Sequence, residues 1–254
     1  WICSSILFYI IMLVFQLFIL PSQQSIISIT TLIYKKRKVN KSIKTVILDF
    51  DGTLGDSYNI ITSTMMQTIA ELGLENHTRE ECAKTIGLPL VECFTSIIPM
   101  TDEMGKKCAE TYSRIFNENN KPGAVTPFPG VIETIKELHE KGLTITIASS
   151  RSHHSLANFV NELKLEEYIT YILGADDTNK AKPDAEPVIK TLKHLGEETT
   201  NTIVVGDTKF DILMGRNAGT ITCGVTYGNG SRKELVDAGA DYIIDDFREL
   251  TEYI

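Results

Sequence analysis

Short apolar runs rich in β-branched residues alternate with amphipathic stretches from residue 45 to the end of the chain. The apolar runs have the length of buried strands, and the amphipathic stretches have the length and spacing of helices. The predicted strands are 45–50, 143–148, 168–173, 201–205, 220–225 and 241–244, and the predicted helices are 131–141, 152–165, 183–195, 211–218 and 232–238. This alternation predicts an α/β fold built on a doubly wound parallel sheet with helices on both faces.

Residues 57–120 interrupt the alternation, because they contain four helical stretches near 58–73, 79–86, 89–98 and 102–119 and no convincing strand. Thr78 followed by Glu81 is a capping-box pattern at the start of the second stretch. We therefore predict an α/β core at 45–56 and 126–254 with an inserted all-helical cap domain at 57–125. Gly55–Ser57 and Lys121–Phe128 are the predicted hinges.

The first 44 residues differ from the rest, since they contain no Asp or Glu and run from an apolar stretch into a cluster of Lys and Arg at 35–44. Residues 1–20 as a helix would be about 30 Å long, enough to cross a bilayer core. Two interpretations stay open: a membrane anchor within residues 1–34 whose basic flank faces the cytoplasm, or a non-native upstream translation. The catalytic domain is expected in the cytoplasm in either case.

The composition is that of an ordinary globular protein, with 43% apolar and 23% charged residues among 254. Without the six basic residues of segment 1–44, 19 Lys and Arg remain against 33 Asp and Glu, a net charge of −14 for residues 45–254. Such an acidic body argues against a nucleic-acid partner. Five scattered cysteines with no CxxC pair predict neither a disulfide framework nor a zinc ribbon.

Two carboxylates directly follow the first predicted strand, in the segment Asp49-Phe-Asp-Gly-Thr-Leu54. In open parallel sheets, ligands bind at the carboxyl ends of the strands. One carboxylate could act as a nucleophile or metal ligand and the other, Asp51, as a proton donor, while Gly52 lets the backbone turn closely around a ligand. The alternative, an acidic turn that caps the next helix, does not account for the whole DFDGTL segment.

Later strands are also followed by candidate site residues. Ser149 and Ser150 come after the second strand, where hydroxyl groups and helix N-terminal amides can bind a phosphate. Asp207 and Asp211 follow the strand at 201–205, and converging carboxylate oxygens suit Mg²⁺. For Ser149 and Ser150 an ordinary helix cap is the alternative, and for Asp211 an acid placed on the helix dipole.

A lysine, Lys182, stands in Ala-Lys-Pro-Asp184 just before a helix that Pro183 is predicted to begin. Its ammonium group could lie over an anionic substrate, although a lone lysine there is more often solvated. In the predicted cap, Ile86–Leu90 is either a loop that reaches the site or a plain turn between helices, and it carries no charged side chain.

Together these motifs resemble the haloacid dehalogenase (HAD) superfamily over residues 45–254, in particular phosphoglycolate phosphatase-like members with a helical cap of the C1 type. The resemblance implies a Rossmann-like core and a Mg²⁺-dependent phosphatase that forms an aspartyl phosphate on a small phosphorylated metabolite. The roles it implies are nucleophile for Asp49, general acid and base for Asp51, phosphoryl ligands for Ser149 and Lys182, and Mg²⁺ group for Asp207 with Asp211.

The residues by themselves support the same chemistry. A phosphomonoester repels an attacking carboxylate, so that Mg²⁺ on Asp49, the main-chain carbonyl of Asp51 and Asp207, together with Lys182, would neutralise its charge. The resemblance implies phosphoglycolate or a sugar phosphate as the kind of substrate. Within the resembled superfamily, haloacid dehalogenases lack the second Asp, so Asp51 argues against that activity. A β-phosphoglucomutase-like phosphosugar mutase, the runner-up, would carry a Glu-Asp pair where Gly206-Asp207 stands, which favours hydrolysis.

Two hypotheses from other classes of protein remain. One is a receiver-type signalling domain, but its acceptor Asp would lie in mid-chain with no helical insertion, contrary to Asp49. The other is a non-catalytic protein anchored in a membrane, which residues 1–44 would suggest and which would have no need for the whole set of motifs.

Overall fold

The computed structural model describes residues 43–254, and its centre is a six-stranded parallel sheet in the order β5-β4-β1-β6-β7-β8. The strands are β1 (Thr45–Leu48), β4 (Thr144–Ala148), β5 (Ile169–Leu173), β6 (Thr202–Gly206), β7 (Ile221–Val225) and β8 (Tyr242–Ile244). From β1 the chain builds β4 and β5 on one side and then crosses to build β6, β7 and β8 on the other. This doubly wound α/β topology confirms the predicted fold class.

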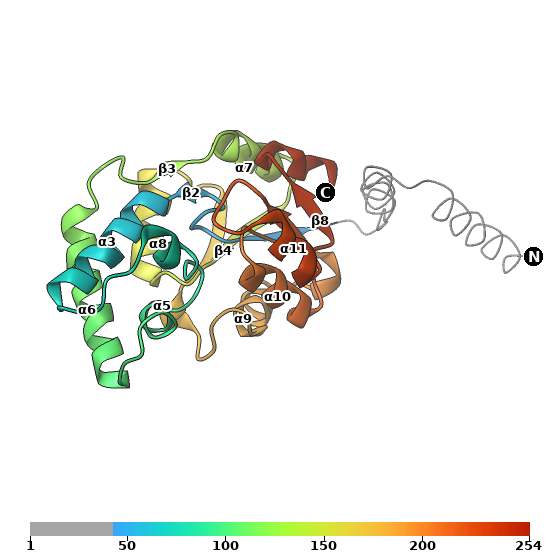
Figure 1. Ribbon diagram of the computed structural model, residues 1–254. Helices are drawn as coiled ribbons and strands as arrows, with labels where there is room; N and C mark the ends of the chain where they lie inside the picture. The colour runs from blue at the N-terminus through green and yellow to red at the C-terminus, as the bar shows by residue number, and fades with distance from the viewer. Residues whose placement is uncertain (1–42) are drawn as a thin grey trace, which may run out of the picture. The chain divides into compact units, whose positions relative to one another are not determined.

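Helices cover both faces of the sheet (Figure 1). They are α7 (Val131–Glu140), α8 (His153–Glu162), α9 (Glu186–Leu195), α10 (Lys209–Ala218) and α11 (Arg232–Ala238), with short 3₁₀ turns η1 (Ala175–Asp177), η2 (Thr199–Asn201) and η3 (Phe247–Glu252). Side chains alternate along β1, so Val46 and Leu48 join the apolar cluster that includes α7 and α8, while Ile47 packs with α9 and α10. Burial on both faces explains why the strand reads as a continuous apolar run.

Several helix ends agree with the glycine pattern of the sequence. Gly196, Gly219 and Gly239 take positive φ angles of 71°, 80° and 82° directly after α9, α10 and α11. The predicted start of α9 was wrong, because the helix begins at Glu186 rather than at Pro183. The Asp184 carboxylate accepts from the Glu186 amide at 2.9 Å and so satisfies one of the free amides at the helix start. Pro183, which was expected to begin the helix, lies before it.

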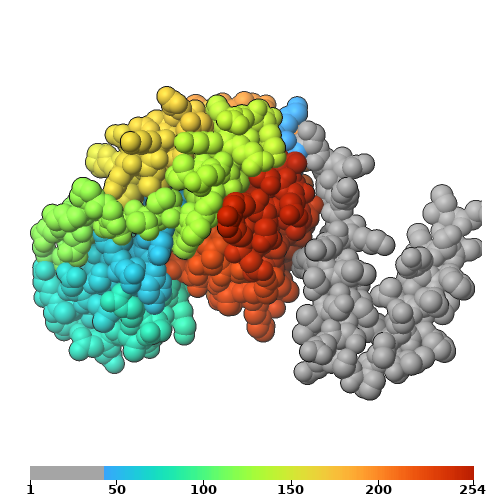
Figure 2. Space-filling view, turned by 90° about the horizontal axis from the view of Figure 1, so that it is seen from above, coloured from blue at the N-terminus to red at the C-terminus, as the bar shows by residue number. Residues whose placement is uncertain are grey.

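Between β2 (Gly55–Asp56) and β3 (Thr126–Pro127), which pair antiparallel, lie the helices α3 (Tyr58–Glu71), α4 (Arg79–Ala83), α5 (Leu90–Thr95) and α6 (Asp102–Asn119). We call residues 58–119 the helical insertion; it forms the cyan-to-green lobe of Figure 2. The Thr78–Glu81 capping box is present, and α4 and α5 are shorter than predicted. The chain turns after α4, where Gly87 has a φ of 103°. The domain boundaries and hinges stay predictions.

The two interpretations of residues 1–44 fall almost wholly outside the described residues. Among residues 43–254, no helix combines the length and apolar character needed to cross a bilayer.

Candidate active site

The residues predicted for the site gather at the carboxyl edge of the sheet because β1, β4 and β6 are adjacent and parallel. Asp49 directly follows β1, Ser149 follows β4 and Asp207 follows β6. The Asp49 amide still donates to the Val205 carbonyl at 2.9 Å, so the nucleophile candidate is held by the last step of the strand ladder. All three residues are buried at the carboxyl edge of the sheet.

Lys182 lies between two of the carboxylates. Its Nζ donates to Asp49 Oδ1 and to Asp211 Oδ1, each at 2.6 Å, and the residue is only 4% exposed. Asp211 Oδ2 in turn accepts from the amide and the hydroxyl of Thr208. Both Asp211 oxygens are therefore engaged within the protein, and the residue fixes the position of the Lys182 ammonium group beside Asp49.

Asp207 is held by residues that the sequence analysis did not select. Its Oδ1 accepts from the Thr53 hydroxyl at 3.3 Å, and its Oδ2 accepts from the amide and the side-chain nitrogen of Asn229 at 2.6 and 3.0 Å. Thr53 stands in the DFDGTL segment, and Asn229 lies between two glycines just beyond β7. A polar residue between glycines at a strand end was the signal that could have identified Asn229.

Gly52 allows the close approach of these groups. It has a φ of 82°, and a Cβ built on it would lie 2.1 Å from Asp207 Oδ2 and 2.3 Å from Asn229 Nδ2. Gly52→Ala should therefore displace Asp207 and lower kcat/KM about 10²-fold, since a shift of about 1 Å can cost that much. Gly73→Ala is the matched control, because Gly73 has a φ of 63° and open space around it. Equal kcat/KM for the two variants would contradict this account.

The carboxylate oxygens of Asp49, Asp207 and Asp211 fit a divalent cation, since one ligand atom of each lies within 4.8 Å of the others. Burial raises the pKa of Asp49 to about 7, with Lys182 opposing and Asp211 adding to the rise. Burial, together with the charges of Asp211 and Asp49, raises the pKa of Asp207 well above its usual range, while Asn229 and Lys182 oppose the rise. When all three carboxylates are ionised, they exceed the single ammonium group by two negative charges, which a divalent ion would balance, and hard oxygen donors suit magnesium.

The Asp51 side chain is separate from this cluster and is held by Arg151, a residue not predicted for the site. Arg151 Nε and Nη2 donate to Asp51 Oδ1 at 2.9 and 2.7 Å, and the Ser57 hydroxyl donates to the same oxygen at 2.5 Å. The guanidinium lies 4.9 Å from the ring centres of both Phe116 and Phe159. Arg151 directly follows Ser149-Ser150. A charged residue so close to a strand end was the signal that could have identified it as a site residue.

Removing Arg151 should destabilise the fold as well as the site. Arg151→Ala leaves a buried Asp51 carboxylate without its cation, and breaking such a pair costs about 3–5 kcal/mol. Urea unfolding measures this change, and Arg114→Ala is the control because Arg114 pairs with Glu71 on the surface, where the side chains are 48% and 50% exposed. An Arg151→Ala variant as stable as Arg114→Ala would show that the pair is unimportant for stability.

Ser149 and Ser150 have different surroundings. Ser149 is buried, its hydroxyl accepts weakly from the Arg151 amide at 3.4 Å, and it lines a cavity together with Asp49 and Asp51. The Ser150 hydroxyl donates to the Gly87 carbonyl at 2.7 Å and so ties the sheet edge to the helical insertion. The N-cap of α8 is Ser152 rather than either of them.

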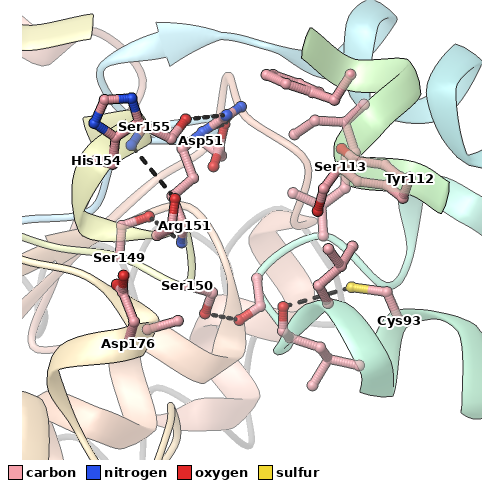
Figure 3. Close-up of a pocket in the computed structure, with 18 of the residues that line it drawn as sticks. Asp51, Cys93, Tyr112, Ser113, Ser149, Ser150, Arg151, His154, Ser155 and Asp176 are labelled. Carbon is pink, nitrogen blue, oxygen red and sulfur yellow. Dashed lines mark hydrogen bonds and ion pairs between the residues drawn. The ribbon is translucent and has the colours of Figure 1, made fainter. Parts of the chain in front are cut away.

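The cavity lies between the sheet edge and the helical insertion (Figure 3) and has a volume of about 530 Å³. Asp49 and Asp51 open into it from the sheet side, and α3, α5 and α6 contribute its opposite wall. The Ile86–Leu90 loop, for which a plain turn was the alternative, contributes Ile86, Gly87, Leu88 and Leu90 to the lining.

Known proteins of one family are similar in sequence to this chain. The model of the haloacid dehalogenase-like hydrolase family matches residues 46–225. The chain is 32% identical over 210 residues to "Pyrophosphatase PpaX" of Anoxybacillus flavithermus, which covers 82% of this chain and 95% of that protein. It is also 32% identical over 187 residues to "Phosphoglycolate phosphatase" of Aquifex aeolicus, covering 73% of this chain and 86% of the relative.

Solved structures show the same fold. A putative haloacid dehalogenase-like hydrolase from Bacteroides fragilis superposes with a TM-score of 0.78 at 24% identity, covering 82% of this chain and all of that one. A predicted phosphatase from Clostridium acetobutylicum gives a TM-score of 0.76, also at 24% identity, over 83% of this chain and 97% of that one.

Proposed function

The chain belongs to the haloacid dehalogenase-like hydrolases, and we propose that it is a magnesium-dependent phosphatase that hydrolyses a small phosphomonoester through an aspartyl phosphate on Asp49. The observation that carries this proposal is the buried contact of Lys182 with Asp49 and Asp211 beside Asp207. A nucleophile, a fixed cation and a set of metal ligands then share one edge of the sheet.

In the first step, an Asp49 carboxylate oxygen attacks phosphorus and the bond from phosphorus to the ester oxygen breaks. Lys182 lies against Asp49, so its ammonium group is already in place to attract phosphoryl oxygens, and the Ser149 hydroxyl can donate to another of them. Neither group has to move into position as charge develops, because both are buried, Ser149 at the end of β4 and Lys182 just before α9.

Asp51 completes both steps by moving a proton. Its Oδ1 is fixed by Ser57 and Arg151, which leaves Oδ2 as the atom that gives a proton to the departing alkoxide. In the second step Asp51 takes a proton from water, water attacks the phosphorus of the aspartyl phosphate, and inorganic phosphate and the Asp49 carboxylate result.

Magnesium would be held by Asp49 and Asp207, with Asp211 nearby and, as predicted from the sequence, the Asp51 main-chain carbonyl. When bound, it would neutralise charge on the phosphoryl oxygens. The substrate would be a small phosphorylated metabolite, which is consistent with the phosphatase names of the relatives. The helical insertion, proposed as a cap, would exclude water from the site.

Turnover of p-nitrophenyl phosphate with and without magnesium tests the proposal. Chelation with EDTA should lower the rate about 10²-fold, because a metal ion contributes several kcal/mol to stabilising the transition state. Magnesium added in excess of the chelator should restore the rate, which controls for damage to the protein. Turnover that EDTA leaves unchanged would refute the magnesium dependence, and no turnover with magnesium would refute the phosphatase.

A further inference from the structure

The two walls of the cavity beyond the reacting groups differ in character. In Figure 3, Ser149, Arg151, His154 and Ser155 lie on one side and Cys93, Tyr112 and Ser113 on the other. The helical insertion contributes an apolar wall that includes Ile61, Met65, Leu88 and Leu90. The lining also carries neutral hydroxyl and amide groups, namely those of Ser113, Asn117, Asn120, Ser155 and Asn158.

Positive charge is scarce in this lining. Among the lining residues of the described chain, Arg151 is the one Arg or Lys, and each of its side-chain nitrogens donates inside the protein. Nε and Nη2 donate to Asp51, and Nη1 donates to the Ser155 hydroxyl at 3.2 Å. The His154 ring, the other basic group of the lining, shares a hydrogen bond with Asn158.

Asp51 and Arg151 form an ion pair, so together they add no net charge to the lining. The charge left over is negative, because Asp176 is an exposed carboxylate at the opposite end of the sheet-side wall in Figure 3, and its Oδ1 accepts from the His153 amide. An anionic group on the substrate's alcohol would therefore meet the Asp176 carboxylate, neutral amides and hydroxyls, and an arginine already paired with Asp51. Desolvating an unpaired carboxylate or phosphate there is costly, and like charges brought together add to the cost.

Resting on the phosphatase function proposed above, we propose that the alcohol released by this enzyme is uncharged, bears several hydroxyl groups and has one apolar flank. Serine hydroxyls and asparagine amides both donate and accept, so they match hydroxyl groups on a substrate. The apolar wall would pack against the flank. The cavity volume of about 530 Å³ also exceeds the volume that a two-carbon alcohol fills, which favours a sugar-sized group. Phosphoglycolate and pyrophosphate, whose leaving groups are anionic, would be poor ligands.

A pair of substrates that differ in one charge tests the proposal on the full chain. Glycerol 3-phosphate and 3-phosphoglycerate share a skeleton, and a hydroxymethyl group in one replaces a carboxylate in the other. Each is measured as a substrate and as a competitive inhibitor of p-nitrophenyl phosphate turnover. We expect glycerol 3-phosphate to have the lower inhibition constant or the higher kcat/KM by about tenfold, the ratio that one charge-assisted interaction corresponds to.

A charge introduced into the cavity should reverse the preference. Asn158→Arg places a cation in the lining, and Asn161→Arg makes the same change on the same helix, α8, at an exposed residue outside the lining. Asn158→Arg should improve 3-phosphoglycerate relative to glycerol 3-phosphate about tenfold, whereas Asn161→Arg should leave the ratio unchanged. An equal effect of both variants would show that the general field of the protein, not the cavity, sets the preference, and would overturn the proposal.

The remaining outcomes are also decisive. If the unchanged protein binds 3-phosphoglycerate or pyrophosphate as well as or better than glycerol 3-phosphate, the proposal of an uncharged leaving group is overturned, but the phosphatase function is not. The same conclusion follows if neither glycerol 3-phosphate nor 3-phosphoglycerate competes with p-nitrophenyl phosphate. If p-nitrophenyl phosphate is not hydrolysed in the presence of magnesium, the phosphatase itself is wrong and this inference fails with it.

Discussion

Asp49→Asn should reduce the hydrolysis of every phosphate ester to background, whatever the leaving group. The amide keeps the shape of the side chain but removes the attacking oxygen and a metal ligand in one change. The variant should still fold, because it removes one of three buried carboxylates and leaves Lys182 paired with Asp211. Relieving that excess of negative charge should keep the midpoint of thermal unfolding of the metal-free protein at or above that of the unchanged chain.

Steady-state rates with p-nitrophenyl phosphate and an alkyl phosphate, together with a thermal melt, measure both expectations. Asp56→Asn is the matched control, since Asp56 is exposed on β2 and stands outside the carboxylate cluster. A burst of p-nitrophenol from the Asp49→Asn variant would show that another residue is the nucleophile. A large fall in its melting temperature would show that the excess of negative charge on the three carboxylates does not destabilise the metal-free protein.

Asp51→Asn should separate the two chemical steps. The amide oxygen can still accept from Ser57 and Arg151, so the local structure should persist, but the proton donor is lost. Alkyl phosphates, which need protonation of a poor leaving group, should be hydrolysed about 10²–10⁴-fold more slowly. p-Nitrophenyl phosphate needs little such help, so it should still phosphorylate Asp49.

Because Asp51 would also activate the water, the aspartyl phosphate should then persist. Rapid mixing should show a stoichiometric burst of p-nitrophenol, and acid quenching should recover an acyl phosphate on the protein. Wild-type rates on an alkyl phosphate would remove Asp51 from the mechanism. A loss on p-nitrophenyl phosphate as complete as that of the Asp49 variant, without a burst, would assign it a structural role.

Local pattern was enough to find most elements of the fold and most candidate groups of the site. Strand 45–50 could be recognised because a strand buried on both faces is a continuous apolar run, and Val46, Ile47 and Leu48 are fully buried. Asp49, Ser149 and Asp207 could be selected because each follows such a run, and the carboxyl ends of parallel strands lie along one edge. The capping box at Thr78 and Glu81 could be read because its residues are only three apart.

The partners of these groups were decided by the tertiary structure. Lys182 contacts Asp49 across 133 residues, Arg151 contacts Asp51 across 100, and Asn229 contacts Asp207 across 22. Sequence periodicity reports which way a side chain faces, not which distant side chain it meets. The strand order that makes β4 and β6 the neighbours of β1 brings these groups together.

The sequence by itself thus determined where along the chain the six strands of the main sheet and the helices lie, and which residue types stand at the sheet edge, because both depend on neighbours within a few residues. The structure alone decided that Ser150 donates to Gly87, that Arg151 holds Asp51, and that the cavity lining carries one already paired arginine. Those features depend on how the helical insertion packs against the sheet edge, where hydrogen-bond geometry and burial are set by segments far apart in the chain.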